Sequence, residues 1–204
     1  PNLQIRGRPV IAISGGRNLA ALVLGGSLLA ACESLDAINP FSGGVAVPEC
    51  PPVALLKDAD RLTAFAPGSG RDISDIVLET EITGFKGECE YIGDDGEYTE
   101  VVLDLRVSFD MILGPAAQRR DHQLKYFIAI PDIYPRPDGR SDFTAKVVFP
   151  PRRNRVTFTD DPLEIKIPLN ENRKGPDTRV VISIALSREQ LQFNRAKTKT
   201  RLRE

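Results

Sequence analysis

The sequence predicts an all-β protein, a single antiparallel β-sandwich of about seven or eight strands with an immunoglobulin- or fibronectin-like outline. Three observations lead to this class. One long segment alternates strictly between apolar and polar residues, a shorter segment repeats that pattern, and the loops between apolar segments are rich in turn-forming residues. No segment has a helical period long enough for the crossover connections of a parallel sheet. A small barrel is the alternative arrangement of the same strands.

The clearest strand is predicted at residues 101–113. Its odd positions are all apolar: Val101, Leu103, Leu105, Val107, Phe109, Met111 and Leu113. Because side chains in a strand point to alternate faces, this pattern predicts one face in the core and one in water. Residues 163–169 repeat the pattern. Pro168 lacks an amide donor, so we expect this second segment to be an edge strand.

The remaining strands are predicted from shorter apolar segments bounded by turns: 75–82, 87–92, 125–130, 142–149, 155–159 and 179–186. Residues 125–130 are apolar on both faces, which predicts a central strand. Helix is expected only as a turn within residues 56–65 and at residues 187–193, where Ser187 is a candidate N-cap.

The formal net charge of −1 conceals an uneven distribution. Residues 1–31 carry three cations and no acid, whereas residues 32–194 carry 19 cations and 27 acids. Such an acidic body lacks the cationic face of a nucleic-acid-binding protein, so we expect no nucleic acid as partner.

Residues 195–204 carry five cations and one acid, and we expect them to form an extended, disordered basic tail. Their cations are candidate contacts for an anionic lipid or polymer: Arg195, Lys197, Lys199, Arg201 and Arg203. A solvated end without a binding role is the alternative.

Thirteen apolar or small residues, Leu19 to Ala31, follow Arg17 near the start of the sequence. A membrane-spanning helix needs about 20 such residues, so this segment is too short to span. A helix packed against the folded domain would be amphipathic, with one apolar and one polar face, and this segment has no polar face. A cationic residue before a short apolar segment with small residues at its end is typical of a secretory signal peptide.

The end of this segment, Leu29-Ala30-Ala31-Cys32, resembles the lipobox of bacterial lipoproteins. The resemblance covers only residues up to Cys32. It implies that residues 1–31 are a signal peptide and that Cys32 carries a lipid through its sulfur. Residues 33–49 contain Gly, Pro, Ser and other small residues without a sustained period, so we expect residues 32–49 to form a flexible tether from the lipidated Cys32. Glu33 rather than Asp after the lipidated position favours the outer over the inner membrane, on the periplasmic face. An ordinary secreted protein is the alternative.

Two cysteines are left for the domain predicted at residues 50–194. An even number in an exported chain suggests a disulfide between Cys50 and Cys89, which would attach the entry from the tether to the strand at 87–92. Two separate buried thiols are the alternative. No metal site is expected, because two distant cysteines and one histidine offer no zinc-ligand spacing.

A search for catalytic residues finds no convincing set. The single histidine, His122, lies in a charged loop and has no evident nucleophile to serve. The acidic segment 93–100 lacks the alternating order of a calcium loop, so we interpret Asp95-Gly96 as the centre of a hairpin turn. Asp160-Asp161, just before Pro162, indicates another turn.

Arginines gather in two loops and could bind an anion, although a solvated role is the simpler interpretation: Arg119, Arg120, Arg152, Arg153 and Arg155. We therefore expect no catalytic residues, no metal and no cofactor. The function predicted is a non-enzymatic interaction or assembly module of the cell envelope. Its partner would be another envelope protein or a cell-wall component. A small-ligand-binding protein or an enzyme with a site built from loops is the alternative.

Overall fold

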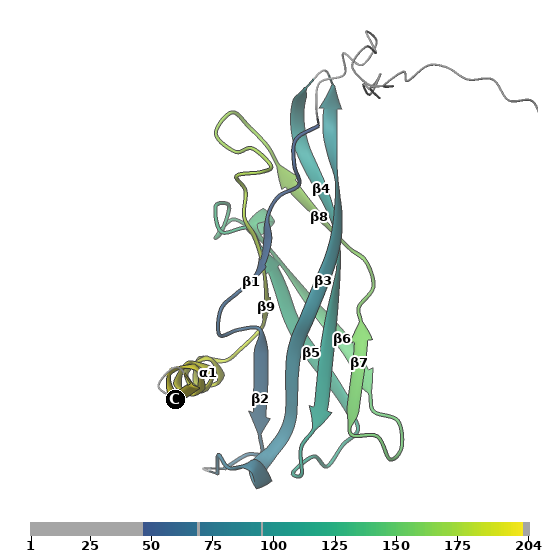
Figure 1. The fold of residues 1–204 in the computed structure, drawn as a ribbon, viewed down its shortest axis with the longest axis vertical. Helices are drawn as coiled ribbons and strands as arrows, with labels where there is room; N and C mark the ends of the chain where they lie inside the picture. The colour runs from purple at the N-terminus through teal and green to yellow at the C-terminus, as the bar shows by residue number, and fades with distance from the viewer. Residues whose placement is uncertain (1–46, 69, 95, 202–204) are drawn as a thin grey trace, which may run out of the picture. The chain divides into compact units, whose positions relative to one another are not determined.

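The computed structural model describes residues 47–68, 70–94 and 96–201. Nine strands and one α-helix follow each other along this part of the chain (Figure 1). Their bounds are β1 Val53–Leu55, β2 Arg61–Phe65, β3 Ile76–Asp94, β4 Glu97–Leu113, β5 Asp121–Ala129, β6 Arg140–Val148, β7 Arg155–Thr159, β8 Leu163–Pro168, β9 Val180–Ile184 and α1 Arg188–Arg201. Two short 3-10 turns lie at Ile73–Asp75 and Pro137–Gly139.

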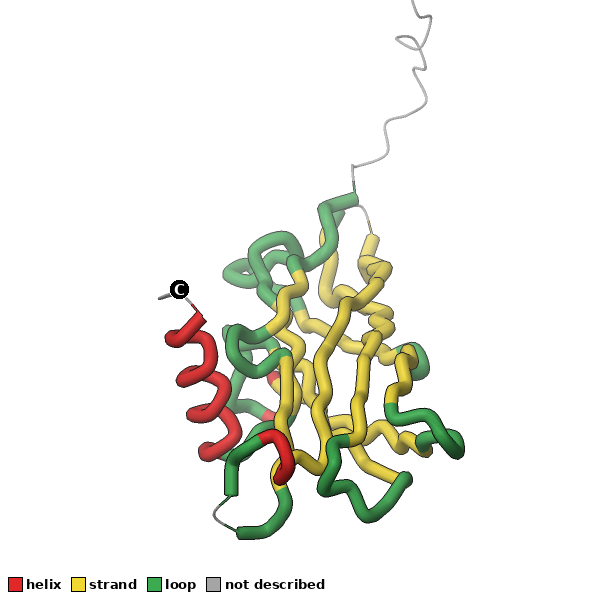
Figure 2. Tube along the Cα trace, turned by 60° about the horizontal axis from the view of Figure 1, so that its bottom comes forward, coloured by secondary structure: helices red, strands yellow, loops and turns green. Residues whose placement is uncertain are grey.

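The strands form two sheets that pack on each other. One sheet has the order β1-β9-β5-β6, and the other has the order β2-β3-β4-β7, with β8 also paired to β4. Figure 2 shows the strands as the main body and α1 beside them. The predicted mostly β, two-sheet class is confirmed, and β5, which contains all but the last residue of the segment predicted to be central, lies between β9 and β6.

The long hairpin β3–β4 forms the middle of the five-stranded sheet. Its register pairs Asp94 with Glu97, so the connection is the short turn that the sequence predicts, and Gly96 adopts a positive φ of 86°. All seven odd-numbered apolar residues of 101–113 are buried, which confirms the predicted alternation. Because both strands run beyond the rest of the sheet, their turn lies at one end of the sandwich (Figure 1).

Strands β7 and β8 lie one after the other along the same side of β4. β7 pairs with Ser108–Ile112, and β8 pairs with Glu100–Leu105. The turn predicted at Asp160-Asp161 is wrong: residues 160–162 continue in the same direction along β4, opposite Arg106 and Val107, and separate the two strands without a turn. β8 has no partner other than β4 among the described strands, which confirms the edge position predicted from Pro168.

The core lies between the two sheets and receives side chains from both. Phe109 of β4 and Tyr126 of β5 are fully buried, with ring centroids 5.0 Å apart, and Phe158 of β7 stacks on Phe109 at 5.3 Å. The Tyr126 hydroxyl donates a hydrogen bond of 2.6 Å to Asp160 Oδ2. Burial, together with this bond to a carboxylate, raises the pKa of Tyr126 above its ordinary value, so the phenol stays neutral in the folded protein.

Three predictions about the strands are wrong in detail. The structure has nine strands, because the short β1 and β2 were not expected, and the segments 75–82 and 87–92 are parts of one strand, β3. β1 pairs with β9 in parallel, so the sheets are not purely antiparallel. Within 56–65, where a helical turn was expected, residues 61–65 form β2, since they pair with β3 and cover its edge.

Candidate functional site

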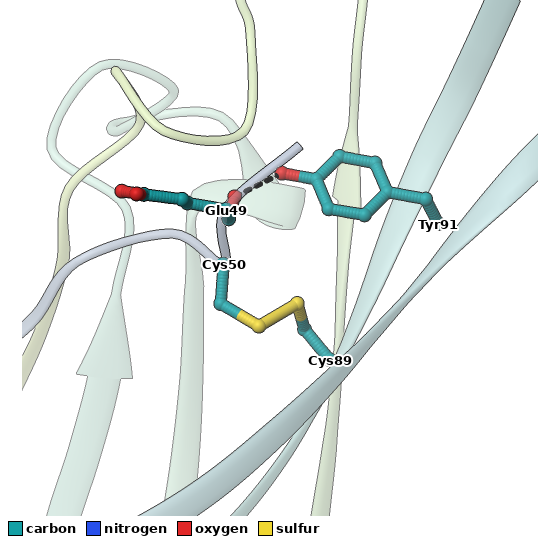
Figure 3. Close-up of a disulfide and its surroundings, with 4 residues drawn as sticks. All are labelled: Glu49, Cys50, Cys89 and Tyr91. Carbon is teal, nitrogen blue, oxygen red and sulfur yellow. Dashed lines mark hydrogen bonds between the residues drawn. A yellow bond between two sulfur atoms is a disulfide. The ribbon is translucent and has the colours of Figure 1, made fainter. Parts of the chain in front are cut away.

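The N-terminal entry to the sandwich is held by a disulfide between Cys50 and Cys89, with Cα atoms 5.8 Å apart (Figure 3). The predicted pairing is therefore confirmed. Next to it, the Tyr91 hydroxyl donates a hydrogen bond of 2.6 Å to the carbonyl oxygen of Glu49. Immediately afterwards the chain joins the sheet, because the Val180 amide donates to the carbonyl of Pro52. Any segment before Glu49 is thus attached to a rigid point of the fold.

Helix α1 begins with a reciprocal cap at the predicted residue. The Gln190 amide donates to Ser187 Oγ at 3.2 Å, and the Ser187 amide donates to Gln190 Oε1 at 2.8 Å. This arrangement satisfies two of the amides that a helix start leaves unpaired. The expected helix at 187–193 is confirmed in its position, and it continues further than expected.

The expected extended tail is wrong for residues 195–201, which complete α1. The Asn194 side chain, only 2% exposed, donates 2.8 Å hydrogen bonds to the carbonyl oxygens of Asp58 and Arg61. Thr198 Oγ1 donates to Asp58 Oδ1 at 2.9 Å. These contacts fix two successive turns of the helix against the segment that leads into β2, and the Ala, Arg and Lys residues between them favour helix.

An aromatic pair and an ion pair hold the first turns of α1. The rings of Phe193 and Phe65 meet edge to face with centroids 5.1 Å apart. Glu189, the single acid of α1, forms an ion pair with Arg71. Lys197 lies over the Phe193 ring, with its Nζ 5.2 Å from the centroid. The helix is therefore attached through one side only, beside β2 (Figure 2).

The opposite side of α1 presents three exposed cations, which we call the outer cations: Arg188, Arg195 and Lys199. Their spacing of seven and then four residues places them on one face, because an α-helix has 3.6 residues per turn. None of the ion pairs among the described residues includes any of the three. The apolar neighbours of this face are Leu191, which is partly buried, and the exposed Ala196.

The charges of the sandwich and of α1 have opposite sign. Residues 47–187 contain 18 cations and 24 acids, whereas residues 188–201 contain five cations and one acid. A cationic helix on an acidic body is an electrical dipole that orients the molecule toward a negative surface.

The predicted lipidation site and the end of the predicted basic tail lie mostly outside the described residues. Arg201 is the last residue of α1, and Arg203 and the predicted lipidation site Cys32 lie outside the described residues. So do the predicted signal peptide 1–31 and residues 32–46 of the predicted tether.

Three of the five arginines expected in loops, Arg119, Arg120 and Arg155, make hydrogen bonds or ion pairs within the protein, whereas Arg152 and Arg153 are exposed. Arg120 donates to the backbone carbonyls of Phe149, Pro150 and Arg153, so it ties the loop between β6 and β7 to β5. Arg119 pairs with Asp121. The expected loop position of His122 is wrong, because His122 lies in β5, where its Nε2 is 3.1 Å from the carbonyl oxygen of Arg119.

Arg155 of β7 pairs with the buried carboxylate of Asp110 on β4, with Nε 2.9 Å from each carboxylate oxygen. Thr157 donates to the same carboxylate at 2.9 Å. These hydrogen bonds, chiefly that from Arg155, hold the pKa of Asp110 below its usual range, although burial opposes the shift.

We expect Asp110→Asn to change how stability depends on pH. Since the pKa of Asp110 is lower in the folded protein than in the unfolded chain, its contribution is present above about pH 4 and is lost as the pH falls through the folded-state pKa. The variant should be less stable than the parent at neutral pH, and the two urea midpoints should converge in acid. A constant difference at every pH would contradict this.

A cavity of about 420 Å³ lies between the turn of the β3–β4 hairpin and the loop from β8 to β9. Tyr91 and Tyr98, with ring centroids 5.0 Å apart, form one wall, and Asn170, Lys174 and Asp177 lie in the loop opposite. This volume falls within the range of small-molecule sites. The described residues that line the cavity include no nucleophile placed next to a general base.

Among the described residues, no cluster of three or more His, Cys, Asp or Glu side chains could hold a metal ion, and the only α-helix is neither long nor apolar enough to cross a membrane. Comparison of the chain with models of protein families, with curated proteins and with solved structures found no match in any of the three. The function therefore has to be argued from the site itself.

Proposed function

We propose that this chain is a lipid-anchored envelope protein whose sandwich is a non-enzymatic interaction module, and that α1 is its contact with an anionic partner. In this proposal Cys32 carries the lipid, residues 33–49 are the tether, and the domain faces the periplasm at the outer membrane. The partner is another envelope protein or a cell-wall component that presents negative charge.

The disulfide supports an envelope location. Disulfides persist in oxidising compartments and are rare in the bacterial cytosol. Cys50–Cys89 also fixes the point at which a tether would pull, so a load applied before Glu49 passes to β3 through a covalent bond before it reaches the three-residue strand β1. A tether of 17 residues reaches at most roughly 55–60 Å, which keeps the domain near its membrane.

The observation that carries the binding proposal is the row of outer cations on an acidic sandwich. The one acid of α1 is already paired with Arg71, so the positive charge of the helix is not neutralised by its own residues. Exposed cations that face a negative surface act mainly by steering encounter and fixing orientation, and each adds about 1 kcal/mol or less. A triple replacement is therefore needed for a clear effect.

The test is in-cell crosslinking of the anchored protein with the outer cations neutralised. The variant Arg188→Gln/Arg195→Gln/Lys199→Gln should lose most of the captured partner, by about tenfold. The matched control is Lys86→Gln/Arg106→Gln/Lys166→Gln, which removes the same charge from exposed positions of the five-stranded sheet and should keep it. An equal loss of capture in the two variants would show that net charge, and not α1, determines binding.

The anchor is tested separately in the same cells by labelling with radioactive palmitate. The parent protein should be labelled and Cys32→Ser should not. An unlabelled parent would contradict the lipid anchor. The crosslinking result would then still test whether α1 binds the partner.

Small-ligand binding is the second candidate, favoured by the cavity beside Tyr91 and Tyr98. Its two aromatic rings and surrounding polar side chains suit a small polar molecule with an apolar face. The crosslinking experiment separates the candidates. Unchanged capture in the α1 variant, together with loss of capture in Tyr98→Ala, would favour the cavity.

A further inference from the structure

Strand β6 is an open edge of the four-stranded sheet. It pairs with β5 and with no other described strand. Its nine residues contain no proline, and the β5–β6 register has no bulge. The other sheet edges are shorter, interrupted or irregular. β1 has three residues, β2 has five and lies beside α1, and the β7–β8 edge is broken at Asp160-Asp161. The side of β3 that extends beyond β2 has two register shifts against β4 and carries the disulfide at Cys89. A long, unbroken edge is a template for a further strand.

The hydrogen-bond pattern shows which residues of β6 face outward. At the two ends of the β5–β6 pair, the Phe149 amide donates to Arg120 and the Ile130 amide donates to Gly139. Bonded and non-bonded pairs alternate in an antiparallel ladder, so the odd-numbered residues of β6 bond to β5. The even-numbered residues therefore direct their N–H and C=O groups to the open edge: Arg140, Asp142, Thr144, Lys146 and Val148.

The inner charges of these five residues complement each other when the strand is reversed about Thr144. If two copies of β6 pair antiparallel with Thr144 opposite its own copy, Asp142 lies opposite Lys146 on both sides of the centre. Arg140 then lies opposite Val148, which is 71% exposed in the single chain. Directly opposed residues of opposite charge stabilise an antiparallel pair, and the outward-facing groups of both copies are in register to bond.

Neighbouring registers lose this match. A centre at Phe143 would place Arg140 opposite Lys146, and a centre at Ala145 would place Asp142 opposite Val148. A lysine in the middle of an edge normally discourages pairing. Here a second copy supplies the carboxylate that Lys146 meets, whereas an unrelated strand would have to provide that charge in the same register.

We propose that β6 is the interface between two copies of this chain, joined antiparallel about a two-fold axis at Thr144 into one continuous eight-stranded sheet. Such an interface uses the same surface on both copies, as closed two-fold dimers do. Asp142 already accepts hydrogen bonds of 2.6–3.1 Å from Arg140 of its own strand, and in the dimer it also faces Lys146 of the second copy. The proposal depends neither on lipid attachment nor on α1.

The test is a charge exchange read by sedimentation velocity of the purified full chain in mild detergent at low ionic strength. The parent should dimerise with increasing concentration. Asp142→Lys alone, and Lys146→Asp alone, each place like charges opposite one another twice and should weaken dimerisation about tenfold. The double variant Asp142→Lys/Lys146→Asp should dimerise as the parent does. An equimolar mixture of the two single variants should form mixed dimers.

A backbone variant provides a second, independent measurement. Because the Thr144 amide faces the open edge, Thr144→Pro removes a donor from the interface and none from the bond to β5, and edge strands tolerate proline. It should abolish the dimer with little change in the urea midpoint. The matched control Glu164→Lys/Lys166→Glu, an equal exchange on β8, should leave dimerisation unchanged. A parent that stays monomeric at every concentration, or single variants that fail to combine, would overturn the proposal.

Discussion

Removal of the disulfide by Cys50→Ala/Cys89→Ala is expected to lower the free energy of unfolding by about 4 kcal/mol. The two cysteines are 39 residues apart, so the bond restricts a long loop of the unfolded chain, including β1, β2 and most of β3. The measurement is the urea midpoint of the purified protein, with the slope compared to check that the same surface unfolds.

The control is the parent protein with its disulfide reduced and alkylated. It should lose a similar amount of stability, because both forms lack the same cross-link. The Tyr91–Glu49 hydrogen bond and the pairing of β1 with β9 would then hold the entry without covalent help. A double variant with the urea midpoint of the oxidised parent would show that the bond contributes nothing to stability.

Phe109→Ala is expected to destabilise the protein by about 3–5 kcal/mol, the range measured for the loss of a buried aromatic side chain. Phe109 is fully buried and contacts rings on both sides, Tyr126 in the opposite sheet and Phe158 in the neighbouring strand. The change would leave a cavity where the two sheets meet. Thermal and urea unfolding of the variant would measure the loss.

Phe127→Ala is the matched control. Phe127 lies in the same strand as Tyr126 but on the outer face, where it is only partly buried and Arg140 covers its ring at 3.8 Å. Its removal should cost clearly less than that of Phe109, because an exposed site leaves no closed cavity. Equal losses at the two positions would contradict the assignment of Phe109 to the core.

Where a segment is long and one face of it is buried, its sequence was enough to predict its place. The alternation in residues 101–113 predicted the buried face of β4, and the apolar segment 125–130 predicted the centre of the other sheet. Pro168 predicted an edge because the missing amide cannot join a ladder. In each case the deciding property is local, so neighbouring residues are sufficient to show it.

Short segments could not be placed in this way. β1 has three residues, and its parallel partner β9 lies more than 120 residues later, so no local pattern announces the pair. β2 was mistaken for a helical turn because its five residues have no long alternation and are fixed by pairing with β3. The expected tail became helix because Asn194 and Thr198 reach the backbone and side chain of Asp58.

The two candidate surfaces, the outer cations of α1 and the edge strand β6, also depend partly on the sequence and partly on the fold. Counting charges located the basic end of the chain, but only the fold shows that Arg188, Arg195 and Lys199 face away from the sandwich while Glu189 is neutralised. Likewise the order of charges in residues 140–148 is visible in the sequence, yet that this strand is an open edge follows only from the sheet order.

The amino-acid sequence by itself determined the longer strands and their apolar faces, and it indicated which cysteines join, because these follow from alternation and from residue chemistry. The tertiary structure alone decided which strands are neighbours, how far α1 continues, and which charges are left unpaired. Those properties depend on contacts between residues far apart in the chain, and no local pattern contains them.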